Sequence, residues 1–289
     1  LVVKLDSPVA GKRSAELSYL SAGLSWRADY VAELAGDEGR LDLAGWVTLT
    51  NQSGTAYDNA RLQLVAGDVN IVRQDFVQKG RALPMAAAPA REMAREEVFD
   101  YHLYSLGRST TLRDNQTRQV ALLTAAQVTV RKEYLLTGES WYYQSQASDR
   151  GRKQKVAVFL EFDNKDGDLG KPLPKGVVRV YKKDTKGNPI FIGEDAIDHT
   201  ARNDTVRLRM GNAFDVTANR KQTDYRLLAG RPNPIYETSW QLEVANGKER
   251  PVTVKVVEPM PGDWEILKES QGHSKGDAHS AVWQIQVPA

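Results

Sequence analysis

Residues 26–34 read WRADYVAEL, and apolar and polar side chains alternate along this stretch. Successive side chains of a β-strand point to opposite faces, so the alternation indicates a strand with one buried and one solvated face. Trp26, Tyr30 and Leu34 belong to the apolar row of this strand. Residues 41–49, LDLAGWVTL, repeat the pattern and predict the next strand.

The same alternation recurs along the rest of the chain, at residues 60–66, 156–162, 206–210, 240–244 and 283–287. The pair Asn246-Gly247 precedes a further row at 252–256 and suits a turn with positive φ, which predicts a hairpin there. Many short alternating runs separated by turn residues are typical of β-sandwiches. We therefore predict an elongated all-β protein of two antiparallel, β-sandwich-like (immunoglobulin-like) halves.

A length of 289 residues leaves room for two domains. The polar stretch 143–155 places a boundary near residue 150, with one domain at 1–150 and a second at 151–289. Residues 78–97 interrupt the pattern, since they are rich in Ala and Pro and hold few large apolar groups. We expect a mobile loop at 78–97 inside the first domain. A short helix over 90–97 is the alternative that propensity allows.

Composition excludes several classes of function. The chain has no Cys, which excludes disulfides, thiolate catalysis and Cys-based zinc sites. With 39 Lys and Arg against 37 Asp and Glu, the net charge of +2 is too small to indicate a nucleic-acid partner. No apolar run is long enough to predict a transmembrane segment. The chain begins at Leu1 in a strand-like run, so we expect its signal peptide to lie outside this sequence.

Catalytic and cofactor motifs are also missing from the sequence. There is no G-x-S-x-G elbow, no phosphate loop and no G-x-G-x-x-G. The histidines lack metal-ligand spacing; they are His102, His199, His273 and His279. His199 follows three carboxylates that could hold a metal, but a polar cluster of this kind favours a surface turn. We therefore predict no catalytic, cofactor-binding or metal-ligating residue, and favour a protein that is not an enzyme.

The acidic residues Asp163, Asp166 and Asp168 invite a calcium interpretation that the spacing does not support. An EF-hand loop that began at Asp163 would place Lys165 at position 3 and Pro174 at position 12. Calcium loops need an oxygen ligand at position 3 and a Glu at position 12. The stretch therefore predicts a turn.

Aromatic residues provide the one candidate contact site. Trp141, Tyr142 and Tyr143 are consecutive, so at least one of them must face away from the core. Exposed aromatic rings stack on sugars or on partner proteins. The alternative is an aromatic segment that crosses between two packed faces.

Several separated stretches together resemble the mucoidy inhibitor-like family, a bacterial domain of unknown function (4139). They are SYL at 18–20, GLSWRADY at 23–30, LQL at 62–64, LGKPLPKG at 169–176, VRVY at 178–181, GED at 193–195 and GNAFDV at 211–216. Tyr57 stands where the family pattern usually has Trp. The resemblance covers nearly the whole chain.

The resemblance implies an exported protein of the periplasm or cell envelope, and it provides no catalytic residues. The function that it favours is a non-catalytic protein-interaction or scaffold module. The alternative is a carbohydrate-active protein, either a glycan-binding module or a hydrolase, because the family name refers to exopolysaccharide phenotypes. The family pattern continues with one more strand after residues 283–287. If that strand is missing from this sequence, which stops at Ala289, its neighbour keeps unpaired backbone groups, so we expect an open strand edge in the second half that pairs with a protein partner or with a second copy.

Overall fold

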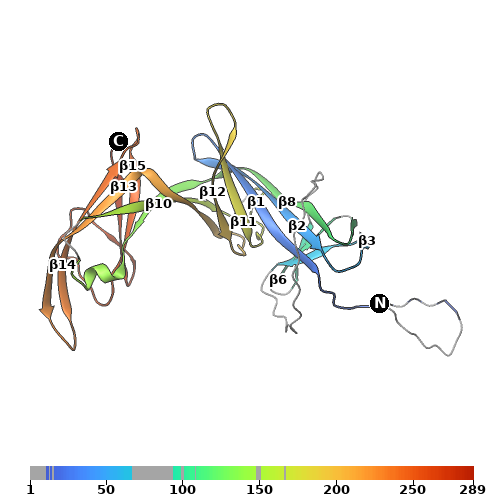
Figure 1. Cartoon of the computed structure of the whole chain (residues 1–289), viewed down its shortest axis with the longest axis horizontal. Helices are drawn as coiled ribbons and strands as arrows, with labels where there is room; N and C mark the ends of the chain where they lie inside the picture. The colour runs from blue at the N-terminus through green and yellow to red at the C-terminus, as the bar shows by residue number, and fades with distance from the viewer. Residues whose placement is uncertain are drawn as a thin grey trace.

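The computed structural model describes residues 11–12, 14, 16–66, 94–98, 101–107, 109–147, 151–165 and 167–289, with the backbone alone for 94–98 and 101. Within these ranges the protein is an elongated assembly of β-sheets with one short 3-10 helix, η1 (Ser140–Tyr143) (Figure 1). This confirms the all-β, two-part prediction. No helix in the described ranges is long and apolar enough to span a bilayer.

A five-stranded sheet organises the first part. Its strands are, in spatial order, β12 (Pro189–Ile197), β11 (Gly176–Lys183), β1 (Leu24–Leu34), β2 (Arg40–Asn51) and β8 (Gln116–Thr129). The alternating stretch WRADYVAEL lies in β1, which forms an antiparallel hairpin with β2. β11 lies parallel to β1 on its other side, although well over a hundred residues separate the two strands.

Tyr30 of β1 fixes how β11 docks. Its side chain is fully buried, and its hydroxyl donates to the Pro174 carbonyl at 2.7 Å. Two glycines on the neighbouring strands make room for the ring. A Cβ on Gly45 would lie 2.9 Å from Tyr30 Cδ1, and one on Gly176 would lie 2.9 Å from Tyr30 Cε2 and closer still to the Ala28 carbonyl oxygen. The ring therefore selects glycine at position 45, whereas at position 176 the Ala28 backbone and the ring together do.

A seven-stranded sheet organises the second part. Its strands are, in spatial order, β14 (Ile235–Asn246), β13 (Thr205–Ala229), β10 (Arg152–Asp163), β9 (Arg131–Thr137), β15 (Val252–Pro259), β17 (Ser280–Val287) and β16 (Ser274–Asp277). Its pairs are antiparallel except for β9 and β15, which run parallel. The sheet curls, so that Asn246 at the end of β14 donates from Nδ2 to the Pro288 carbonyl beyond β17 at 3.0 Å.

Two small sheets complete the first part. One pairs β3 (Tyr57–Ala60) with β7 (Thr110–Leu112), and the other has the order β4 (Gln63–Ala66), β6 (Tyr101–Ser105), β5 (Ala94–Val98). The predicted row at 60–66 is thus divided between β3 and β4. Residues 78–93 of the predicted loop lie outside the described residues. Residues 94–97, which were expected in the loop or in a short helix, belong to strand β5 and pair with β6.

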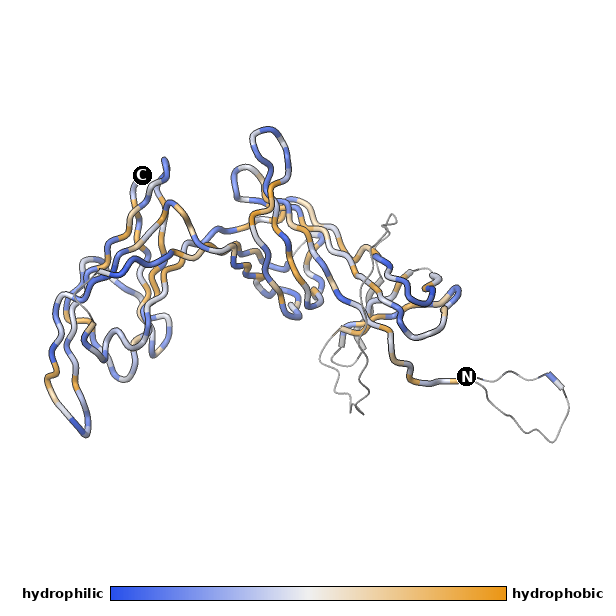
Figure 2. The backbone as a smooth tube through the Cα atoms, viewed as in Figure 1, coloured by the Kyte–Doolittle hydropathy of each residue, from blue (hydrophilic) through white to orange (hydrophobic). Residues whose placement is uncertain are grey.

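Each part has its own hydrophobic core, and Figure 2 shows apolar residues along the strands of both. β10 and β13 run between the parts and contribute to both cores (Figure 1). In β10, Phe162 packs in the first core and Val156 in the second; in β13, Leu208 packs in the first and Val216 in the second. The GNAFDV stretch at 211–216 lies where β13 has extra residues relative to β10, between these two positions.

Strand pairing does not divide the chain at residue 150. Residues 176–197 form β11 and β12 in the sheet of β1 and β2, whereas residues 131–137 form β9 in the second sheet. The two sheets therefore each combine segments from before and after the boundary that the polar stretch 143–155 suggested.

The hairpin predicted at Asn246-Gly247 is wrong. β14 pairs with β13, and β15 pairs with β9 and β17, so the two strands that flank this turn are not neighbours. Neither residue has positive φ. The Asn246 side chain instead donates to the carbonyls of Arg250 and Pro288, which holds a connection between separate strands.

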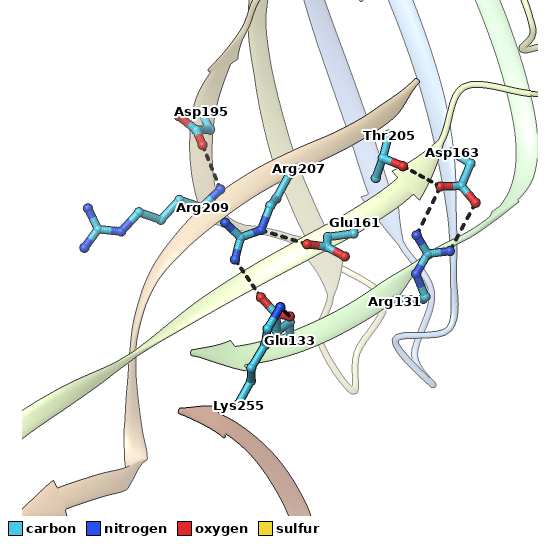
Figure 3. Close-up of polar contacts among 9 residues, drawn as sticks. All are labelled: Arg131, Glu133, Glu161, Asp163, Asp195, Thr205, Arg207, Arg209 and Lys255. Carbon is cyan, nitrogen blue, oxygen red and sulfur yellow. Dashed lines mark hydrogen bonds and ion pairs between the residues drawn. The ribbon is translucent and has the colours of Figure 1, made fainter. Parts of the chain in front are cut away.

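Ion pairs join four strands on one face of the second sheet, near the place where the two parts of the molecule meet (Figure 3). Arg207 of β13 reaches Glu161 of β10 at 2.7 Å and Glu133 of β9 at 2.6 Å, and Lys255 of β15 reaches Glu133 at 3.1 Å. Arg131 makes two hydrogen bonds to Asp163, at 3.1 and 3.2 Å. A connected network of this kind restricts movement of the strands relative to one another more than isolated surface pairs do.

Glu38 links the two parts of the molecule. It lies in the turn between β1 and β2, and its carboxylate contacts Lys182 at 2.7 Å, Lys132 at 2.8 Å and Arg250 at 2.9 Å. Burial opposes ionisation, but the hydrogen bonds and charges of Lys132 and Lys182 prevail and lower the pKa of Glu38 to about 2. The ionised carboxylate therefore favours the observed approach of the two parts.

We expect Glu38→Gln to remove part of the acid sensitivity of the fold. A carboxylate whose pKa is lowered on folding stabilises the native state fully above its unfolded value, here 4.5, and loses that contribution as the pH falls towards about 2. Urea unfolding of both proteins across this window should show a smaller pH dependence for the variant. Asp37→Asn, in the same turn, is the control. An identical pH dependence for wild type and Glu38→Gln would contradict the role of Glu38.

Candidate functional site

Trp141, Tyr142 and Tyr143, which were predicted as contact residues, all lie in η1. This helix connects β9 to β10 and packs against β14. Their exposures differ: Trp141 is 44% exposed, Tyr142 is 3% exposed, and Tyr143 is half-buried. Tyr142 and Trp240 of β14 have ring centroids 5.1 Å apart, and Trp141 meets Tyr142 edge-on at 4.6 Å. Trp141 is therefore the one ring of the three that offers a broad surface to a ligand.

A buried ion pair lies beneath η1. Arg220 of β13 and Glu258 of β15 are both almost fully buried and paired through Arg220 Nη2 and Glu258 Oε1. Tyr143 donates its hydroxyl to the other Glu258 oxygen at 2.7 Å. Burial, followed by the negative charge of Glu258, raises the pKa of Tyr143. Because both oxygens of Glu258 are engaged, the arrangement anchors η1 to the sheet rather than presenting a free carboxylate.

Further polar contacts complete this anchor. Arg220 Nε donates to Gln154 Oε1 at 3.1 Å, and Gln154 Nε2 donates to the Tyr142 hydroxyl at 2.8 Å. The Arg220 guanidinium also lies 4.8 Å from the centroid of the Tyr142 ring. The sequence did carry a signal for these residues. Arg220 and Glu258 continue the inward-facing rows of β13 and β15, where charged residues are rare.

Within the described residues, no group of three or more His, Asp or Glu side chains lies where it could hold a metal ion. His102 and His199 line one pocket together with Tyr104 and Leu173. His199 Nδ1 accepts from the Lys175 backbone N–H at 3.2 Å. His273 lies between Trp264 and Trp283 and contacts Glu269 at 3.0 Å.

Strand β14 is the candidate interaction edge. It ends the seven-stranded sheet, and among the described strands it pairs only with β13. It is twelve residues long and reads IYETSWQLEVAN, without Pro, Lys or Arg. Natural edge strands are usually protected from pairing by Pro, Lys, short length or β-bulges. β14 lacks the first three of these protections.

β14 also lacks a bulge of its own. The other three strands that end the two large sheets, β8, β12 and β16, each contain an extra residue at every register shift with their neighbour. Where β14 and β13 shift register, at Gln222/Asp224 and Leu227/Ala229, the extra residues belong to β13. β14 therefore remains regular along its length, which is the geometry that an added strand requires.

No curated protein matches the chain. Two of the stretches that resembled a family have clear structural roles in the fold. LGKPLPKG at 169–176 supplies the carbonyls that Tyr30 and Tyr104 bind, and GNAFDV forms the irregular crossing of β13. A match over residues 15–289 shows that the chain belongs to the family described as Domain of unknown function (DUF4139).

Proposed function

We propose that this chain is a non-catalytic protein-interaction module of the cell envelope that binds an extended segment of a partner protein along β14. The regular, unprotected edge of β14 carries the proposal. An added strand would satisfy the outward backbone N–H and C=O groups of β14 and gain affinity from main-chain hydrogen bonds. The location in the envelope is supported by the family resemblance alone.

The framework behind the edge suits a scaffold. β13 reaches from the edge strand β14 to the core of the first part, and the network around Arg207 ties it to β10 and β9. η1 supports β14 from one face through the contact of Tyr142 with Trp240. A supported edge loses little conformational entropy when a partner binds. The glycan alternative has less support, because Trp141 is exposed but Tyr142 is not.

Amide hydrogen exchange tests the edge directly. Amides along an antiparallel edge strand point alternately towards the neighbour and towards solvent. In the free protein we therefore expect every second amide of residues 238–245 to exchange fast. Peptides selected from a random display library against the immobilised chain should slow those outward amides. A selected peptide can be N-methylated either at its odd-numbered or at its even-numbered residues. One of these two peptides should no longer bind, because its methyl groups replace the N–H groups that point towards β14, and the other should still bind.

A pair of substitutions provides the control. Ser239→Lys places a charge on the edge strand, whereas Thr253→Lys makes a comparable exposed change on β15 inside the sheet. We expect the first to weaken peptide binding and the second to leave it unchanged. Peptides that bind both variants equally, or that slow exchange in other strands while β14 is unaffected, would show that this edge is not the binding site.

A further inference from the structure

The register of β14 defines which side chains a partner strand must carry. In an added strand, each residue lies opposite one residue of β14, and their side chains share a face of the sheet. The two faces of β14 differ in chemistry, since its even-numbered and odd-numbered residues point to opposite sides. The inference that follows rests on the proposed function and specifies its partner.

The even-numbered face of β14 is apolar towards its C-terminal end. Trp240, Leu242 and Val244 lie on it, and the last two pack against the second core. All three remain only half-buried, because no strand covers their outer flank among the described residues. An added strand with apolar residues at alternate positions would cover these flanks and extend the core.

The odd-numbered face is mostly polar and includes the carboxylates of Glu237 and Glu243. Glu243 is exposed, and one of its oxygens accepts from Gln241 Nε2 at 2.9 Å. Glu237 is already paired with Arg226 of β13 at 3.2 Å. On the β13 side, Lys221 lies opposite Gln241, and Asn219 lies opposite Glu243. Both of these residues lie on the β13 side, so a cation that approaches Glu243 from the open side of β14 belongs to the partner.

A second copy of β14 does not fit this requirement. β14 contains two Glu and neither Lys nor Arg, so a second β14 strand would offer Glu243 no cation in any register and a second carboxylate in some. Like charges opposite one another destabilise cross-strand pairs, whereas opposite charges stabilise them. The charge pattern favours a different protein segment over self-association through this edge.

We propose that the partner of β14 is an extended protein segment in which apolar residues alternate with polar ones, with Lys or Arg in the polar row opposite or diagonal to Glu243. The apolar row lies beside Trp240, Leu242 and Val244. The basic residue lies on the opposite face and pairs with the Glu243 carboxylate.

Three synthetic peptides of equal length test the pattern. In the first, apolar residues alternate with Thr and Lys; in the second, Glu replaces each Lys; the third has the composition of the first with its apolar residues clustered. Fluorescence anisotropy measures their affinities. We expect the first peptide to bind about fivefold more tightly than the second, and both to bind more tightly than the third. Glu243→Lys should reverse the order of the first two peptides.

Glu265→Lys is the matched control, because it makes the same change in net charge at an exposed loop position. It should preserve the preference for the basic peptide. Equal binding of basic and acidic peptides, both lost in Ser239→Lys, would overturn the charge pattern and leave the edge as a binding site. A clustered peptide that binds as tightly as the alternating one would overturn the alternating pattern. This conclusion would hold even if peptides selected from the library bind along β14.

Discussion

Gly176→Ala should destabilise the protein by about 3 kcal/mol or more, because the new methyl group would collide with backbone as well as with a rigid ring. The Cβ would meet the Ala28 carbonyl oxygen of β1 and lie 2.9 Å from Tyr30 Cε2. Neither group can move away without disturbing the parallel pairing of β1 and β11. Urea unfolding followed by circular dichroism measures the loss. Gly272→Ala, at a position with open space around it, should have little effect.

Gly45→Ala provides a sharper comparison. There the added Cβ would meet mainly the side chain of Tyr30, 2.9 Å from Cδ1, and we expect a loss of about 1–3 kcal/mol. Tyr30→Leu should relieve part of this collision, so the double variant should be more stable than the sum of the single changes predicts. The same second change should rescue Gly176→Ala much less, because the closest contact of that methyl group is with the Ala28 backbone. Equal rescue of both glycine variants would show that the tyrosine ring alone sets the packing.

Arg220→Ala should destabilise the second part of the molecule by about 3–5 kcal/mol, because it leaves Glu258 buried without its cation. Thermal or urea unfolding measures this effect. Arg27→Ala is the control, since Arg27 pairs with Asp29 at 3.1 Å on the surface, where such pairs contribute about 0–1 kcal/mol. We also expect η1 to loosen in Arg220→Ala, with faster exchange of the Tyr142 and Gln144 amides.

Replacing both charges distinguishes a lost pair from an isolated buried charge. Arg220→Met combined with Glu258→Leu removes both ions, and apolar replacement of a buried pair is often close to neutral. The double variant should therefore be more stable than Arg220→Ala, although Tyr143 and Gln154 lose partners in it. A double variant that is less stable than the single one would show that the hydrogen bonds to Tyr143 and Gln154 outweigh the ion pair.

The sequence could not show which of the three consecutive aromatic residues is exposed and which is buried. Alternation predicts that consecutive residues face different ways, but Trp141 to Tyr143 are in a 3-10 helix, where no alternation applies. Tyr142 is buried because Trp240 and Arg220, from strands far along the chain, provide a surface for its ring. Which ring remained exposed depended on those distant partners.

The strands themselves were predictable, because the alternation of apolar and polar side chains is a local property of the chain. β1, β2, β10, β13, β14 and β17 all contain the rows that the sequence showed. The missing Cys likewise excluded disulfides and thiolate chemistry. The sequence by itself therefore determined the all-β class, the faces of the main strands and the family.

Which strands lie side by side was decided only by the tertiary structure. The Asn246-Gly247 pair gave a local hairpin signal, yet β15 pairs with β9 because its Val254 and Val256 share a buried core with Tyr134 and Leu136. Likewise, β11 lies beside β1 because Gly176 and Pro174 fit around Tyr30. Burial of side chains across the sheet outweighs local turn preference, and alternation does not specify a partner. The row at 283–287 lies in β17 between β15 and β16, so only this pairing order, and no local pattern, places an open edge at β14.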